Sequence, residues 1–137
     1  MALSLFSCNR NFSVAKCQAD FDSGEAPAAA DLVGKWVAVG LATAEIKVFE
    51  ASGLQQGNRP VWTLEFSDAE SLRLDSRYVG TRPQTPTVTV TDEQISFRQG
   101  YDTDLAFDFH CRIARNGRLV CLEATKAAMG LEFKRAE

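Results

Sequence analysis

The sequence has one histidine, no excess of positive charge and no closely spaced cysteines, and each of these facts argues against a class of function. A nucleophile–His–acid site would depend on one histidine, His110. A net charge of -3 argues against a nucleic-acid partner, because binding to a phosphate backbone needs a basic face. Glycine-rich nucleotide-binding patterns are also missing. The sequence therefore predicts no catalytic residue, no cofactor and no nucleic-acid partner.

Long apolar runs are missing too, since none approaches the ~20 residues that cross a bilayer. The start, Met1–Cys8, resembles the end of the apolar region of a secretory signal but lacks a basic beginning. Leu5-Phe6-Ser7-Cys8 also resembles a bacterial lipobox, in which the cysteine carries the lipid. We expect a secreted or periplasmic protein, with a membrane tether through Cys8 if it is a lipoprotein. An ordinary N-terminal tail is the alternative.

Four cysteines, at positions 8, 17, 111 and 121, are compatible with disulfides in an oxidising compartment. They are not arranged in short Cys-x-x-Cys pairs, which structural zinc sites usually contain. We therefore predict no metal site.

The chain divides into an irregular N-terminal segment, residues 1–30, and one domain, residues 31–137. Ser23–Pro27 has the composition of a linker, and a short helical turn is expected at Ala28–Leu32. From Gly34 onward apolar residues recur with period two, as in half-buried strands. The predicted strands are Trp36–Leu41, Glu45–Glu50, Val61–Phe66, Ser71–Asp75, Thr87–Thr91, Gln94–Arg98, Asp104–Ile113, Arg118–Ala124 and Gly130–Lys134.

These short strands and the turns between them favour an all-β fold in which sequence neighbours pair antiparallel. A long sheet with one apolar face curls and closes, which also removes its exposed edges. We predict an up-and-down β-barrel of about eight to nine strands, with a β-sandwich as the alternative.

Five large apolar residues are expected to point into this barrel: Trp62, Leu64, Phe97, Phe107 and Phe109. They are the candidate residues for binding a small hydrophobic ligand. They could equally fill the interior, which is favoured because small barrels hold side chains. His110 lies on the opposite, polar face of its strand, and we interpret it as a solvent-facing structural residue.

The hairpin between Cys111 and Cys121 has two possible registers. A two-residue turn at Asn116-Gly117 pairs Ile113 with Val120 and keeps the apolar residues on one face. A three-residue loop with a bulge at Gly117 instead places Cys111 opposite Cys121, where a disulfide is conceivable, but it splits the apolar set. We favour the first register, in which Cys111 is a buried thiol and Cys121 faces outward to pair with Cys17 or Cys8.

Asp31-Leu32-Val33-Gly34-Lys35-Trp36 resembles the Gly-x-Trp opening strand of the calycin superfamily, which includes lipocalins, fatty-acid-binding proteins and avidins. In that superfamily the tryptophan closes one barrel end and a basic residue from the last strand packs across it. The resemblance assigns these structural roles to Gly34, Trp36 and Arg135, and a guanidinium over an indole is favourable in itself. The lipocalin Thr-Asp-Tyr motif and the helical lid of fatty-acid-binding proteins are absent.

The periplasmic metalloprotease inhibitors are similar in size and in having Gly-x-Trp after a segment outside the barrel. Together these features predict a non-enzymatic exported binding protein that carries a small hydrophobic ligand or docks a protein partner. The alternative is a periplasmic enzyme inhibitor or immunity-type protein that acts through its loops or through residues 1–30.

Overall fold

The computed structural model describes residues 13–43, 55–56, 59–60, 62–78, 84–102, 105–123 and 129–136. Two helices lie within these ranges, α2 (Val14–Asp22) and α3 (Ala29–Leu32). The long strands are β1 (Gly34–Thr43), β4 (Trp62–Ser67), β5 (Arg73–Tyr78), β7 (Ile95–Asp102), β8 (Leu105–Ile113), β9 (Leu119–Glu123) and β10 (Met129–Arg135). The short ones are β2 (Gln55–Gln56), β3 (Arg59–Pro60) and β6 (Val88–Val90).

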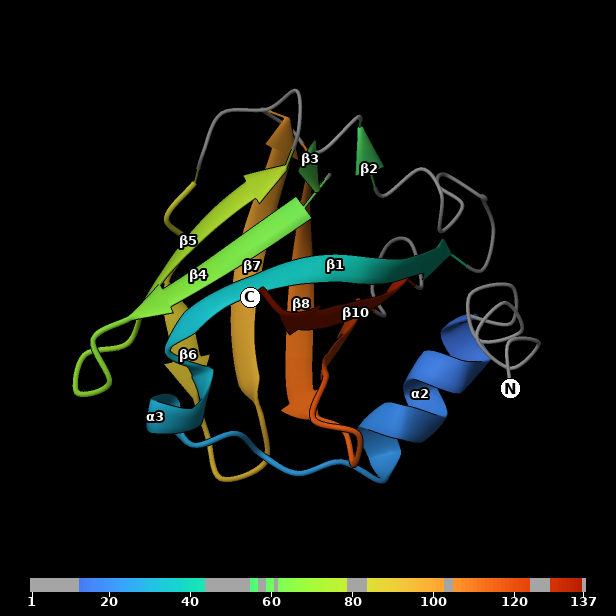
Figure 1. The fold of residues 1–137 in the computed structure, drawn as a ribbon, viewed down its shortest axis with the longest axis horizontal. Coiled ribbons are helices and arrows are strands. Elements are labelled where there is room, and N and C mark those ends of the chain that lie inside the picture. Colours follow the sequence, from blue (N-terminus) through green and yellow to red (C-terminus); the bar gives the residue numbers. More distant parts are fainter. Residues whose placement is uncertain are drawn as a thin grey trace.

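One eight-stranded antiparallel sheet, in the order β5-β4-β1-β10-β9-β8-β7-β6, curls into a nearly closed barrel (Figure 1). The predicted up-and-down barrel is confirmed, and a single continuous sheet excludes the sandwich. Strands β2 and β3 form a separate small hairpin. The first long strand pairs with the last, because β1 lies between β4 and β10.

The barrel closes between β5 and the segment before β6 through one bridge. The backbones of Ser76 and Gln84 exchange two hydrogen bonds of 2.7 and 2.8 Å. Counting on from this bridge, Leu74 would face Pro86, which has no N–H to donate. The proline therefore explains why the ladder ends here.

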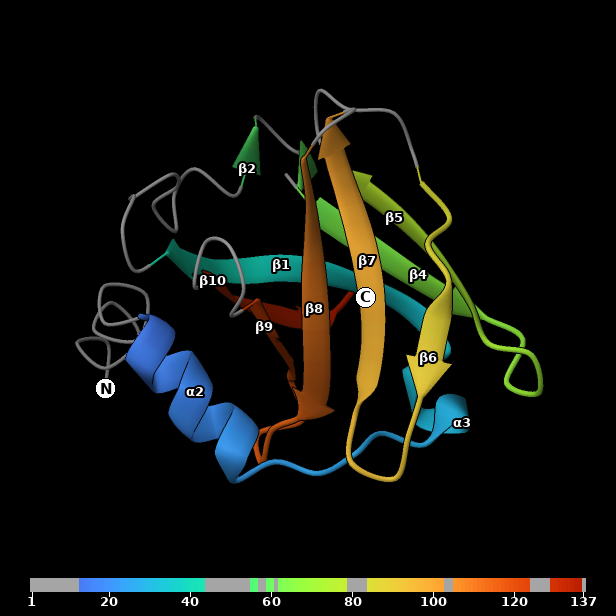
Figure 2. The same cartoon turned by 180° about the vertical axis from the view of Figure 1, so that it is seen from behind.

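Helix α2 lies against the outside of the barrel, where β8, β9 and β10 run (Figure 2). Its N-cap is Ser13, whose hydroxyl accepts from the Lys16 N–H. Cys17 and Phe21, four residues apart on one face, are buried with Ala114, Val120 and Leu122. This helix was not predicted, although Ser13 and the spacing of its two buried residues are the signals for it.

The two sides of the barrel are buried differently. Strands β8–β10, which we call the helix-covered wall, pack on the core inside and on α2 outside, and every residue of β9 is buried. Strands β4 and β5, the bare wall, alternate between buried and half-buried or exposed residues. Period-two alternation of burial is thus kept along the bare wall and lost in β9, where α2 covers the outer face.

The favoured register of the β8–β9 hairpin was wrong. Cys111 faces Cys121 and the two are joined by a disulfide, while Cys17 is a free, buried thiol. The loop has three residues, closed by a 2.8 Å bond from the Ala114 N–H to the Arg118 carbonyl. Gly117 adopts a φ of 85°, which favours glycine.

The argument against this register was that it splits the apolar set. That cost does not arise, because α2 covers Val120 and Leu122 on the outer face. Glu123, sent to the inner face, is buried, and its carboxylate accepts from the Asp108 N–H. The packing of α2 on the barrel therefore makes favourable a register that the hairpin residues alone would disfavour.

The expected helical turn at Ala28–Leu32 is present as α3, whose Leu32 joins the core. The other predicted strands match observed ones with shifted ends. The predicted strand Glu45–Glu50 and the candidate lipid-bearing Cys8 lie outside the described residues.

Candidate functional site

The barrel interior brings together the five candidate ligand-binding residues. Trp62, Leu64, Phe97, Phe107 and Phe109 come from β4, β7 and β8, and all are buried. Their alternation within each strand places them on the same side of the sheet. The sequence therefore located this cluster.

The rings of this cluster pack against one another. Phe109 lies at its centre, with ring centroids 5.5 Å from Phe97, 5.8 Å from Trp62 and 6.3 Å from Phe107. Trp62 also meets Phe133 edge-on at 6.2 Å, and its indole N–H donates to the Ser76 hydroxyl. These separations are typical of aromatic pairs in a packed core. Side chains thus occupy the part of the interior where these five residues meet, which agrees with the favoured interpretation of a filled barrel.

The predicted contact at one end of the barrel is present. The guanidinium of Arg135 stacks 4.5 Å over the Trp36 ring, and these residues are also register partners between β1 and β10. Arg135 donates to the carbonyls of Val33 and Asp31, while the Trp36 indole donates to that of Leu32. A Cβ at Gly34 would lie 3.0 Å from the guanidinium, and its φ is 130°. Both facts explain glycine at this position.

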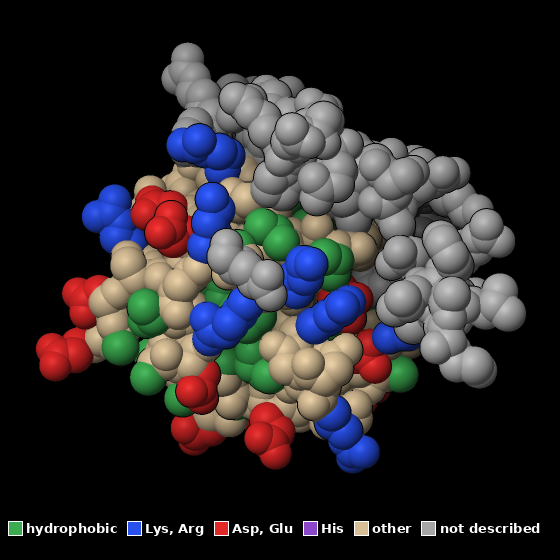
Figure 3. Space-filling view, viewed as in Figure 1, with side chains coloured by type: hydrophobic (Ala, Val, Ile, Leu, Met, Phe, Trp, Pro, Cys, Tyr) green, Lys and Arg blue, Asp and Glu red, His purple; other side chains and the backbone are tan. Residues whose placement is uncertain are grey.

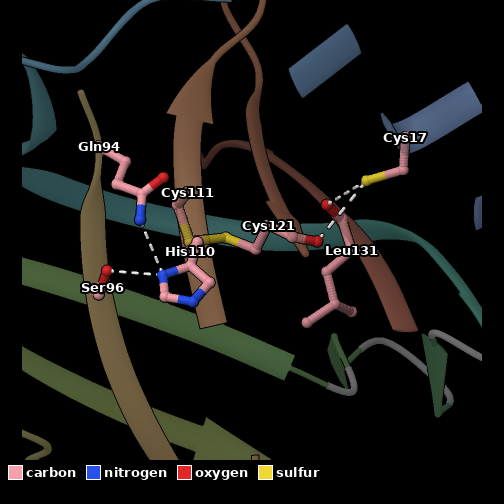
Figure 4. The surroundings of a disulfide bond; sticks show 7 residues. All are labelled: Cys17, Gln94, Ser96, His110, Cys111, Cys121 and Leu131. Atoms are coloured by element: carbon pink, nitrogen blue, oxygen red, sulfur yellow. Dashed lines mark hydrogen bonds between the residues drawn. A yellow bond between two sulfur atoms is a disulfide. The ribbon is translucent and has the colours of Figure 1, made fainter. Parts of the chain in front are cut away.

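The free thiol of Cys17 lies between α2 and the helix-covered wall. It points at the carbonyls of Cys121 and Leu131, 3.6 Å from each, and not at the disulfide (Figure 4). Burial, and secondarily the negative charge of Glu132, raise the pKa of Cys17 to about 12. A thiol that stays protonated is a poor nucleophile, so Cys17 is a packing residue.

His110 lies on the outer face of β8, as predicted, but it has partners that the sequence did not reveal. Its Nδ1 lies 2.8 Å from the Ser96 hydroxyl and 2.9 Å from the Gln94 amide nitrogen (Figure 4). Ser96 is its register partner across β7 and β8. The Nδ1 atom therefore lies between two polar side chains, a hydroxyl and an amide. This is a cross-strand polar cluster that ties two strands together.

Among the described residues, no group of His, Cys, Asp and Glu could hold a metal ion. Neither α2 nor α3 is long and apolar enough to span a membrane.

Part of the N-terminal segment is fixed to the barrel. Arg112 stacks 4.6 Å over the Phe21 ring and donates to the Phe21 carbonyl at the end of α2. Glu25 then forms a two-bond bridge with Ile113. Residues 13–32 therefore belong to the folded body.

A second grouping lies on the outside, where β5, β4, β1 and β10 run side by side (Figure 3). Lys and Arg side chains gather with hydrophobic ones in the middle of this face, and most Asp and Glu side chains lie toward its rim. One register row crosses the four strands as Arg77, Thr63, Val37 and Lys134. Only pairing between distant strands creates this row, so it was missed from the sequence.

Comparison with known proteins assigns no family to this chain, because no family model, curated protein or solved structure matches it.

Proposed function

We propose that this chain is a non-enzymatic, exported binding protein, built on a calycin-like barrel, whose partner is another protein. The observation that carries the proposal is the contact between aromatic rings in the described part of the barrel interior. Rings centred on Phe109 occupy the region that a carrier of small hydrophobic ligands would keep open. Binding is therefore left to the outer surface and the loops.

The disulfide between Cys111 and Cys121 supports export, because such bonds persist in oxidising compartments. The contact between Trp36 and Arg135 supports the calycin-like description, since the resemblance implied this closure. The surroundings of His110 support a non-enzymatic role, because its described partners are a hydroxyl and an amide without a carboxylate.

The docked helix argues against one form of the inhibitor alternative, in which the N-terminal segment enters an enzyme as a free arm. An arm that enters an enzyme must be free, whereas residues 13–32 pack on the barrel through α2 and the Glu25 bridge. Deleting residues 1–30 would expose Val120 and Leu122, so loss of inhibition would not identify the arm as the inhibitor.

A displacement titration separates a protein-binding barrel from a ligand carrier. We expect the native chain to show no saturable binding of a fluorescent fatty acid. A fatty-acid-binding protein serves as the positive control, because the cavity left by removing one ring from this barrel would hold only a molecule of about benzene size. Saturable binding to the native chain, displaced by unlabelled fatty acid, would move the proposal to a lipid carrier.

Native mass spectrometry of the protein isolated from its source at low salt tests the partner itself. We expect a heteromeric complex above the 15.0 kDa chain mass. A monomer alone, under conditions that keep the disulfide intact, contradicts a protein partner.

A further inference from the structure

We propose that the outer row of Arg77, Thr63, Val37 and Lys134 is the docking surface for an acidic segment of the protein partner. This inference rests on the proposed function and adds to it the location and the chemistry of the contact. The row is continuous, because Arg77 pairs with Thr63, Thr63 with Val37, and Val37 with Lys134.

The row carries positive charge at both ends and none of the opposite sign. The side chains of Arg77 and Lys134 are exposed, and neither forms an ion pair with a described residue. Thr63 and Val37 between them are half-buried, so they offer a flatter and partly apolar centre. A charged rim around a less polar centre is the usual anatomy of a protein interface.

The rows on either side differ from this one. On one side Lys35, Glu65 and Asp75 are register partners, so both signs are present there. On the other side Glu132 is buried, and its carboxylate accepts from Arg118 at 3.1 Å. Unbalanced positive charge is therefore concentrated along one line, in a chain whose net charge is -3.

The spacing of charges along this row indicates which partner segment would fit it. Arg77 and Lys134 are separated by three strand spacings, which is roughly 14 Å along the sheet. A matching segment crosses the strands with carboxylates near its two ends and an apolar side chain over Val37. Charge complementarity of this kind mainly speeds association and gives it salt dependence.

The probe is a synthetic glutamate-rich peptide with one central leucine, and its control replaces each glutamate with glutamine. We expect the glutamate peptide alone to shift the backbone amide NMR signals of Val37 and Lys134, with binding that weakens as salt is added. Equal binding of the glutamine peptide, or shifts that map to another face, would overturn the proposal.

Two charge-reversal variants, equal in charge, locate the effect. Arg77→Glu with Lys134→Glu is expected to weaken binding by about tenfold or more, because both attractive ends become repulsive. Arg98→Glu with Arg115→Glu makes the same net change elsewhere on exposed positions and is expected to leave binding within about twofold. Equal loss in both variants would show that only net charge matters, and the row would be rejected.

Vesicles of phosphatidylglycerol form a separate arm. If they bind the row and the glutamate peptide does not, the surface is for a membrane and this inference fails. A fatty acid bound in the interior would instead contradict the proposed function. The two failures are thus distinguishable.

Discussion

The helix-covered wall and the bare wall belong to one sheet, but they differ in how residue alternation along a strand relates to burial. On the bare wall, β4 alternates between buried residues and half-buried or exposed ones. On the helix-covered wall, β9 is buried at every position because α2 packs on its outer side. The comparison teaches that alternation stops marking the core where a second element buries the outer face as completely as α2 buries that of β9.

The strongest test of this comparison places a charge at an outward position on each wall. Val120→Asp would bury a carboxylate under α2, opposite Glu132, so we expect a loss of about 3–5 kcal/mol in the free energy of unfolding. Thr63→Asp, on the bare wall, should change it by no more than about 0.5 kcal/mol. Urea unfolding of both variants is the measurement, and equal effects would show that α2 does not cover the wall.

The second test removes the crosslink that only the helix-covered wall carries. Replacing Cys111 and Cys121 together with alanine should lower the free energy of unfolding by about 2–4 kcal/mol, chiefly because the unfolded chain gains freedom. Reductant should lower the guanidinium midpoint of the native chain and of a Cys17→Ala control alike. An unfolding midpoint that does not change when reductant is added would contradict the disulfide.

A third test separates the helix from the wall. A Cβ at Gly130 would lie 2.8 Å from the Cys17 Cβ, so we expect Gly130→Ala to push α2 outward at a cost of about 1–3 kcal/mol. Cys17 should then react with iodoacetamide in the folded protein. Gly117→Ala is the control for destabilisation without a clash: no atom lies within 4 Å of the added methyl, the φ of 85° makes alanine unfavourable, and Cys17 should stay protected.

The smallest expected effect concerns the Cys17 thiol. Its pKa is raised from 9.0 to about 12, so its contribution to stability is complete below pH 9.0 and is lost as the pH rises toward 12. At pH 10 we expect the native chain to lose about 1.4 kcal/mol relative to pH 8, beyond any loss in Cys17→Ala. If both proteins lose the same amount, the thiol is not buried as described.

The barrel and its interior could be predicted because alternating apolar and polar residues within a strand indicate which of its sides is buried. Phe107, Phe109 and Cys111 alternate with Asp108 and His110, and this pattern depends only on the strand. The Trp36 contact with Arg135 was also predictable, but only through a family resemblance that supplied the pairing of the two ends.

The hairpin register could not be predicted from the hairpin alone. The element that makes the observed register favourable, α2, lies far away in the sequence and covers Val120 and Leu122 from outside. The row from Arg77 to Lys134 was missed for a similar reason, since its four members come from four strands. Long-range contacts of this kind leave no local periodicity.

The pairing of β1 with β10 has a consequence for how the chain matures. The barrel cannot close until the last strand has been synthesised, because β10 completes the pairing of β1 and part of the surface on which α2 packs. Such distant pairing predicts slow folding, in milliseconds to seconds, that begins only after most of the chain has left the ribosome. Closure of this barrel is therefore a late event in the folding of the chain.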